Sequence, residues 1–175
     1  MARLIFAMNV SLDGYVDHDR FAPDALLFRH WIEQVRESSA SLYGRGLYDL
    51  MRYWDADDPG WGPQERDFAE AWRAVPKWVV SRGKIEVGPN AQQVTGDLAA
   101  AVQGLKDSVE GTIDIGGPVL ARALAELGLV DEYRLYYHPV VLGHGRPLFT
   151  GPLPRLRLTG NDPFGEVVRL TYAPT

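Results

Sequence analysis

Apolar and polar residues vary along the first two thirds of this chain in a pattern that predicts strands and helices in alternation. A continuous apolar run, which is typical of a strand buried on both faces, occupies residues 4–8, and shorter strands are predicted at 41–43, 78–80 and 112–115. Apolar residues that recur every three or four positions predict helices beginning at about Asp24, Pro63, Asp97 and Pro118. This order predicts an α/β fold built on a mostly parallel sheet.

The last of these helices has clear signals at both ends. Pro118 suits a first helical turn, where no backbone N–H donor is needed, and Gly128 lies just past the expected end. The apolar stripe between them is expected to be buried, and it consists of Val119, Leu120, Ala123, Leu124 and Leu127.

The final third of the chain has a different pattern. An aromatic strand is predicted over residues 131–138, followed by turn-rich residues 143–147 and by two strand-like stretches at about 155–159 and 166–172. In the last stretch Val168, Leu170 and Tyr172 fall on one face. Because no helical pattern separates the last two strands, we expect them to pair antiparallel.

Composition limits the class of protein. The 175-residue chain is 46% hydrophobic, which suits one globular domain spanning residues 1–175. Its net charge of −5, without a block of Lys or Arg, disfavours a nucleic-acid partner. No apolar run reaches the ~20 residues needed to cross a bilayer, and no signal peptide is recognisable. We therefore expect a cytoplasmic protein with no membrane partner.

Absent residue types and absent motifs exclude several kinds of catalytic and metal-binding site. The absence of cysteine excludes disulfides, thiolate metal sites and cysteine nucleophiles. The four histidines show no metal-ligand spacing such as H-E-x-x-H, so we expect no bound metal. No G-x-S-x-G motif is present, which leaves a hydrolase triad without support.

Three short segments remain, and each follows a predicted strand. They are Gly44-Arg45, Ser81-Arg82 and Gly116-Gly117-Pro118-Val119. Ligands of open α/β sheets collect at the carboxyl ends of the strands, where glycines let the backbone approach phosphate groups. The first and third segments also lead into helix-like patterns, whose free amides would face an anion. Together the segments predict a nucleotide-cofactor site.

Each segment also has a simpler explanation. Arg45 can hold a phosphate or stack on an adenine, but it can equally be a solvated arginine in a tight turn. Ser81 and Arg82 can grip the adenosine 2′-phosphate that distinguishes NADPH from NADH, or they can form an exposed cationic loop. The paired glycines can approach a pyrophosphate, or they can simply start a helix.

Five segments, in order over nearly the whole chain, carry a resemblance to a known family: MNVSLDGYV, YGRGLYD, VVSR, IDIGGPVLARAL and LVDEYRLYYHPVVLGHGRPLF. They resemble the RibD C-terminal branch of the dihydrofolate-reductase-like fold, which includes the reductases of riboflavin biosynthesis. The resemblance implies a twisted, mostly parallel sheet with an antiparallel C-terminal edge and flanking helices. It also implies bound NADPH and, commonly, a homodimer.

The resemblance further implies roles for individual residues. Backbone groups around Ala7 would hold the nicotinamide carboxamide, and the peptide bond between Gly116 and Gly117 would be cis. Asp13 would lie near the nicotinamide, where it could bind a polar substrate group or act in catalysis by helping to relay a proton. Asn9 is a weaker candidate for binding substrate. The alternative for Asp13 is an ordinary turn aspartate.

These features predict an NADPH-dependent reductase that transfers hydride to a small pyrimidine- or pteridine-related substrate, similar to the 5-amino-6-(5-phosphoribosylamino)uracil reductases of the riboflavin pathway. Three departures from that family leave the substrate open: Leu47 replaces a frequent hydroxyl residue, Tyr15 replaces a frequent lysine, and residues 25–28 lack the acid of a folate reductase. A dihydrofolate reductase is one alternative. A non-catalytic nucleotide-binding or assembly protein on the same fold is the other.

Overall fold

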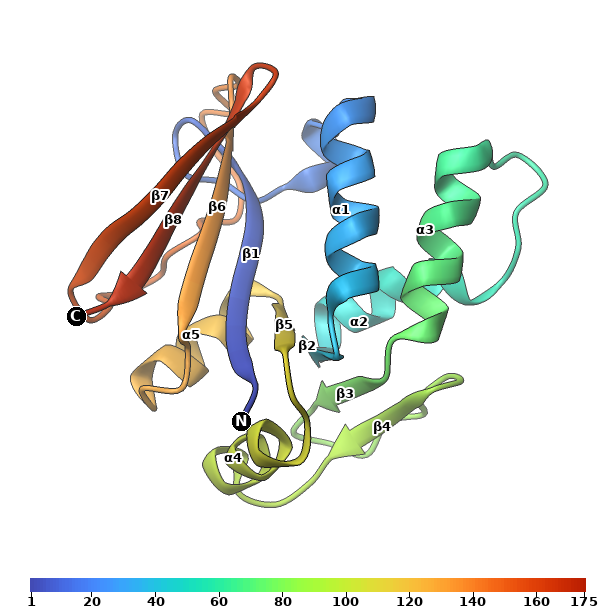
Figure 1. Cartoon of the computed structure of the whole chain (residues 1–175), viewed down its shortest axis with the longest axis vertical. Helices are drawn as coiled ribbons and strands as arrows, with labels where there is room; N and C mark the ends of the chain where they lie inside the picture. Colours follow the sequence, from blue (N-terminus) through green and yellow to red (C-terminus); the bar gives the residue numbers. More distant parts are fainter.

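A single eight-stranded sheet organises the computed structural model, which describes residues 1–175 (Figure 1). Its strand order is β4-β3-β2-β5-β1-β6-β8-β7. The strands are β1 (Arg3–Ser11), β2 (Ala40–Gly44), β3 (Lys77–Val80), β4 (Ala91–Val94), β5 (Thr112–Gly116), β6 (Glu132–His138), β7 (Leu156–Phe164) and β8 (Val167–Pro174). Strands β1 to β6 run parallel, whereas β8 and β7 form an antiparallel hairpin against β6, which confirms the predicted fold class.

Helices cover both faces of the parallel part of the sheet. They are α1 (Ala25–Glu37), α2 (Arg45–Met51), α3 (Pro63–Ala74), α4 (Leu98–Ser108) and α5 (Pro118–Glu126), with short 3-10 turns at His18–Arg20 and Arg52–Asp55. Helices α1 and α3 lie on one side of the sheet, and α4 and α5 lie on the other (Figure 1). None of the helices has the length and apolar character that a bilayer crossing requires.

Two of the predicted helix starts are confirmed by side-chain caps. The Asp24 side chain accepts a hydrogen bond from the Leu27 amide at 2.8 Å, and Asp97 accepts one from the Ala100 amide at 2.9 Å. Each carboxylate satisfies an amide that has no partner inside the helix, which is typical of an N-cap.

The two layers of helix produce two separate apolar cores. In the larger one, side chains of β1 and β5 such as Phe6 and Ile115 pack against Leu120 and Leu124 of α5. The smaller core lies on the other face, between α1, α3 and the strands β2 and β3, and it includes Ile32, Tyr43, Phe68, Trp72 and Val79. Burial of such side chains stabilises each layer by about 1.5–3 kcal/mol per large residue.

The buried stripe of α5 differs from the prediction. Val119 is 82% exposed and Leu127 is 47% exposed, whereas Ala121 and Ala125 are buried beside Leu120 and Leu124. The reason is that α5 begins where the chain leaves the edge of the sheet, so the side chain of its first turn projects outward. Small alanines then let the helix approach the strands closely.

Strand β4 was not predicted from the sequence, and β7 is longer than predicted. The stretch Ala91–Val94 contains two glutamines and becomes a strand by pairing with β3 at the edge of the sheet. Strand β7 continues through Pro163, which the outer strand of a sheet tolerates because one side of its backbone needs no partner. Both differences arise from long-range pairing and not from local sequence.

A buried lysine lies beneath the smaller core. Lys77, at the start of β3, is 1% exposed, and its Nζ donates to the Val75 carbonyl oxygen at 2.9 Å. The ammonium group also lies 4.2 Å from the centre of the Trp72 ring, and it forms no ion pair. Burial lowers the pKa of Lys77 to about 8 because a charged amine is poorly solvated there.

Replacing Lys77 with methionine should change how stability depends on pH. The amine has a pKa of about 8 when folded and its ordinary 10.5 when unfolded, so between these values the unfolded chain binds the extra proton. The free energy of unfolding of the wild type should therefore rise by roughly 2–3 kcal/mol through this window, relative to Lys77→Met, with no Lys77-dependent change below it. Urea unfolding of both proteins at intervals between neutral pH and about pH 10 measures this difference. A difference that stays constant would contradict the burial of the ammonium group.

Candidate functional site

The connections of the sheet form a topological switch point between the carboxyl ends of β1 and β5, and we refer to this edge of the sheet as the β1–β5 crevice, after the ligand sites that such points form in other α/β sheets. The chain leaves β1 for α1 on one face, and it leaves β5 for α5 on the opposite face (Figure 1). Neighbouring parallel strands whose connections diverge in this way leave a gap at their carboxyl ends, and such topological switch points are where open α/β sheets bind ligands.

Most of the predicted site residues lie along this edge of the sheet. Phe6 pairs with Ile115, so Ala7 lies beside Gly116 at the start of the crevice. Gly44 ends β2 close to the Gly116 carbonyl oxygen, and it pairs with Val80 of β3. Strand order and register therefore bring together Ala7, Asn9, Gly44, Arg45, Ser81, Arg82, Gly116, Gly117, Pro118 and Val119 at one edge.

The start of α5 offers unpartnered amides to this crevice. Gly117 is the N-cap residue, and no side chain caps the helix. Pro118 has no N–H, so the first free amides are those of Val119 and Leu120, and the side chain of Val119 projects into solvent. Amides at the start of a helix attract anions because the helix dipole is positive there. This geometry fits a pyrophosphate.

The two glycines in this turn are required for different reasons, and the cis bond expected between them is absent. The chain contains no cis peptide bond, so Gly116–Gly117 is trans, and the chain turns into α5 through the φ of +105° at Gly117. A Cβ on Gly116 would overlap the ring of Tyr43 from β2. The space beside Gly116 is thus occupied by a protein side chain, whereas Gly117 needs glycine for its backbone conformation.

The two arginines of the site are both exposed but differ in their partners. Arg45 lies at the start of α2 and forms an ion pair with Asp49 at 3.5 Å. Arg82 follows β3 and forms no ion pair, which leaves its guanidinium available to a ligand. The loop that carries Arg82 is held by Gln93, whose side chain accepts from the Ile85 amide and donates to the Gly83 carbonyl oxygen.

Asp13 joins two loops near the end of β1. Its carboxylate accepts hydrogen bonds from the Ser11 hydroxyl at 2.7 Å and from the amides of Leu142 and Gly143 at 3.1 and 2.7 Å. The Ser11 hydrogen bond, together with these amides, lowers the pKa of Asp13 to about 2. Near neutral pH this carboxylate has no proton to relay, and it fixes the loop that follows β6. A contact between Asp13 and substrate stays a prediction.

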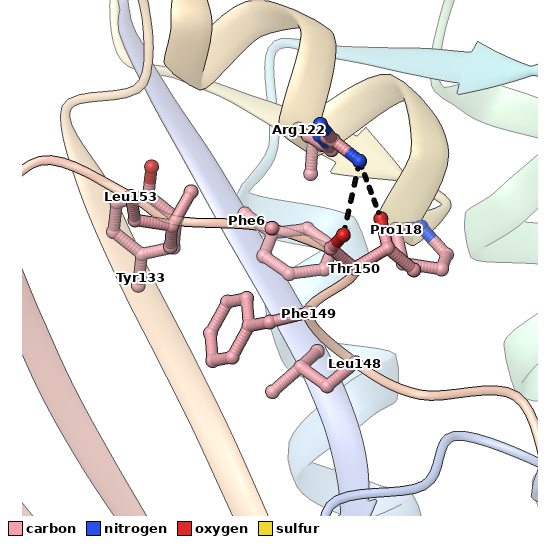
Figure 2. A pocket seen from close by; sticks show the side chains of 10 residues that line it. Phe6, Pro118, Arg122, Tyr133, Leu148, Phe149, Thr150 and Leu153 are labelled. Atoms are coloured by element: carbon pink, nitrogen blue, oxygen red, sulfur yellow. Dashed lines mark hydrogen bonds between the residues drawn. The ribbon is translucent and has the colours of Figure 1, made fainter.

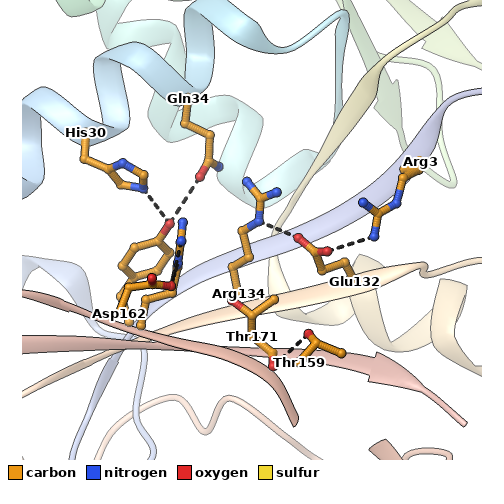
Figure 3. A network of polar contacts seen from close by, with 10 residues as sticks. Arg3, His30, Gln34, Glu132, Arg134, Thr159, Asp162 and Thr171 are labelled. Atoms are coloured by element: carbon orange, nitrogen blue, oxygen red, sulfur yellow. Dashed lines mark hydrogen bonds and ion pairs between the residues drawn. The ribbon is translucent and has the colours of Figure 1, made fainter. Parts of the chain in front are cut away.

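A polar network closes the space between α1 and β6 (Figure 3). His30 Nε2 lies 2.7 Å from the Tyr136 hydroxyl, which donates to Gln34 Oε1 at 3.2 Å. Further along β6, Glu132 accepts from Arg134 at 2.6 Å and from Arg3 at 2.8 Å. The side of α1 that faces the sheet therefore presents imidazole and amide groups, and its two glutamates, at positions 33 and 37, are exposed.

One carboxyl group is buried beneath the end of α1. Asp114 of β5 accepts a hydrogen bond from the Ser38 hydroxyl, and its second oxygen is buried without a partner. This burial raises the pKa of Asp114 to about 6 because the ionised form loses solvation. Such a shifted carboxyl is typical of functional sites, but the packing around Asp114 already explains its pKa.

A separate pocket lies on the opposite face of the sheet, between α5 and residues 148–153 (Figure 2). Phe6 and Tyr133 form its floor. At its rim Arg122 donates to the carbonyl and hydroxyl oxygens of Thr150 at 3.2 and 2.9 Å. Its charged group is therefore already satisfied, and the pocket contains none of the unpartnered polar groups found at the β1–β5 crevice.

Sequence reasoning gave no role in the site to three further residues, and it expected one of them, His138, to be structural. Tyr43 fills the space at Gly116, Gln93 holds the Arg82 loop, and His138 contacts Asn9 with its Nε2 2.9 Å from Oδ1. Gln93 belongs to a strand that carries no local signal. His138 lies at the end of a predicted strand beside the turn-rich segment, and that position was the only hint of a role at the carboxyl edge.

Comparisons with known proteins agree on one family. The sequence model of the RibD C-terminal domain matches residues 2–170. The uncharacterized protein YyaP of Bacillus subtilis (strain 168) is 32% identical over 172 residues, which cover 89% of this chain and 85% of that protein.

Solved structures share the fold. A Shewanella sp. PV-4 protein, described in terms of riboflavin biosynthesis, superimposes with a TM-score of 0.74 at 23% identity over 100% of this chain and 99% of its own. RibD of Acinetobacter baumannii gives 0.72 at 17% identity, covering 100% of this chain and 58% of that one. A diaminohydroxyphosphoribosylaminopyrimidine deaminase/5-amino-6-(5-phosphoribosylamino)uracil reductase of Thermotoga maritima gives 0.66 at 17% identity, covering 99% of this chain and 57% of that one.

Replacing Gly116 with alanine should lower the free energy of unfolding by about 1–3 kcal/mol, because the added Cβ overlaps the Tyr43 ring and overpacks the site. Gly46→Ala is the matched control: a Cβ there meets no atom within 4 Å, and in α2 it should be neutral or slightly stabilising. Chemical denaturation of both variants measures the difference. Equal stability of Gly116→Ala and the wild type would show that Tyr43 does not require this glycine.

Proposed function

The chain belongs to the RibD C-terminal domain family, and on that premise we propose that it is an NADPH-dependent reductase. The family contains reductases, and a neighbour in structure carries a uracil reductase in its description. We propose hydride transfer to a small pyrimidine- or pteridine-related substrate. Fold alone does not establish chemistry, so the proposal depends on the site itself.

The arrangement of the carboxyl ends of β1 and β5 and the start of α5 is the observation that carries the proposal. It combines a topological switch point with a helix start that no side chain caps. Each of these favours a phosphorylated dinucleotide, and they meet at one place. An assembly protein has no need for free amides and a free arginine along the same edge.

Different residues along the crevice can bind different parts of the cofactor. The amides of Val119 and Leu120 suit the pyrophosphate, and the guanidinium of Arg82 suits the adenosine 2′-phosphate. Backbone groups around Ala7 would hold the carboxamide of the nicotinamide. Bound there, NADPH supplies a hydride, which leaves the protein to orient the substrate and exclude water. This division explains why the chain has no obvious catalytic dyad.

The substrate is better matched to a pyrimidine than to folate. A folate reductase needs a carboxylate on the first helix, facing the sheet, to assist protonation. Here that side of α1 presents Leu27, His30 and Gln34. A pyrimidine related to 5-amino-6-(5-phosphoribosylamino)uracil is therefore our preferred substrate class, and dihydrofolate is the less favoured one. Tyr15 follows the Asp-Gly pair where the related reductases often have a lysine, so the proposal does not extend to a phosphate group on the substrate.

Two further expectations stay part of this proposal. The first is a homodimer, which the exposed apolar side chains of the C-terminal hairpin, such as Leu158 and Val168, support because they leave one sheet face uncovered. The second concerns the non-catalytic nucleotide-binding or assembly protein, which no residue of the site specifically favours. Failure to bind either NADPH or NADH would favour that alternative.

Replacing Arg82 with alanine should weaken NADPH binding about tenfold or more and change NADH binding by less than about twofold, because a charge-assisted hydrogen bond to phosphate contributes about 1.5–3 kcal/mol. Titration followed by tryptophan fluorescence measures both dissociation constants. Arg157→Ala is the matched control, since Arg157 is exposed on β7 and forms no ion pair. Equal losses for both cofactors would remove Arg82 from the 2′-phosphate.

A further inference from the structure

The end of β1 carries a side-chain contact that cofactor binding does not explain. His138, the last residue of β6, is 4% exposed, and its Nε2 lies 2.9 Å from Asn9 Oδ1. The ring of Phe21 packs against the imidazole at 4.8 Å between centroids. The histidine is thus held in one orientation by packing, with one nitrogen directed at Asn9.

The chemistry of the two groups fixes the direction of this hydrogen bond. An amide oxygen can only accept, so Nε2 of His138 must carry the hydrogen and donate it. Burial lowers the pKa of His138, which favours the neutral ring, and the hydrogen bond to Asn9 Oδ1 then places the single proton on Nε2. The carbonyl end of the Asn9 side chain is therefore occupied, and its NH2 end points elsewhere.

The NH2 group of Asn9 has no hydrogen-bond partner in the protein, and Asn9 lies in the carboxyl-terminal part of β1. Asn9 is two residues after Ala7 on the same face of β1, beyond the last pairing of β1 with β5. The nearby Ser11 hydroxyl has no free hydrogen to donate, since it donates to Asp13 and accepts from the Tyr15 amide at 2.9 Å. Asn9, which is half-buried, therefore provides the polar side chain with a free donor near the carboxyl end of β1.

We infer that His138 is a positioning residue that makes Asn9 a hydrogen-bond donor to the substrate. The site then selects a substrate with an acceptor at that place, namely a carbonyl oxygen or an unprotonated ring nitrogen. A ring N–H at that place would face the NH2 group and be rejected, since two donors cannot pair. This inference rests on the proposed reductase function for its substrate, but the orientation of Asn9 does not depend on that function.

The orientation is tested first, without any ligand. Nitrogen-15 NMR of the imidazole should show the neutral His138 ring protonated at Nε2. In Asn9→Asp the new carboxylate should raise the pKa of His138, whereas Asn161→Asp, an exposed change on β7, should leave it unaltered. A ring protonated at Nδ1 with Nε2 bare would mean that Asn9 presents its oxygen to the crevice, and this result would overturn the inference.

The selection of substrate is tested with 5-amino-6-(5-phosphoribosylamino)uracil as the probe, in the presence of NADP⁺. The probe should shift the side-chain NH2 resonances of Asn9 but not those of Asn161. In NADPH oxidation assays His138→Leu should raise KM about tenfold with a smaller change in kcat, and His138→Gln, which keeps an N–H donor, should restore most of the loss.

The outcomes separate the two ideas. Unmoved Asn9 resonances would overturn the donor role of Asn9, whether or not the probe is reduced. Moved Asn9 resonances without NADPH oxidation would support the donor role and count against the reductase. Equal KM values for the wild type and His138→Leu would show that His138 has no positioning role.

Discussion

At the centre of the sheet, the connection after β1 and the connection after β5 leave for opposite faces, and the position of the candidate site depends on this topology. Crossovers between parallel strands are right-handed, so a connection that moves one way along the sheet places its helix on one face, and the opposite movement places it on the other. Here α1 carries the chain from β1 towards β2, and α5 carries it from β5 towards β6. The topological switch point between the carboxyl ends of β1 and β5 follows from these connections.

Packing around the crevice then decides which groups remain free. Tyr43 fills the space beside Gly116, and Asp13 accepts from the Ser11 hydroxyl and from two amides of the loop after β6. What is left are backbone amides at the start of α5, the guanidinium of Arg82 and the amide of Asn9. These are groups that bind and orient, which suits a protein whose cofactor supplies the reacting hydride.

The sequence was sufficient for those parts of the fold that local chemistry specifies. The caps at Asp24 and Asp97 and the strand runs of β1, β2, β3 and β5 follow from residue type and spacing, and all are found. Strand β4 could not be predicted, because its glutamines form a strand only through pairing with β3. Family membership came from ordered motifs and is confirmed by the match over residues 2–170.

The details of the site were less accessible to sequence reasoning. The three segments at Gly44, Ser81 and Gly116 share one edge because each follows a parallel strand, and the alternation of strands and helices in the sequence predicts parallel strands. The crowding at Gly116 depends instead on Tyr43 from another strand, and the partner of Asn9 is a histidine 129 positions away. Contacts of this kind are set by tertiary packing, so no local sequence pattern predicts them.

The most direct measurement of the central claim is the change in backbone amide NMR resonances when NADPH is added. Binding in the β1–β5 crevice should shift the amides of Val119 and Leu120 at the start of α5, together with those around Ala7 in β1. Shifts confined to residues 148–153 on the opposite face, or no shifts at saturating NADPH, would contradict the account.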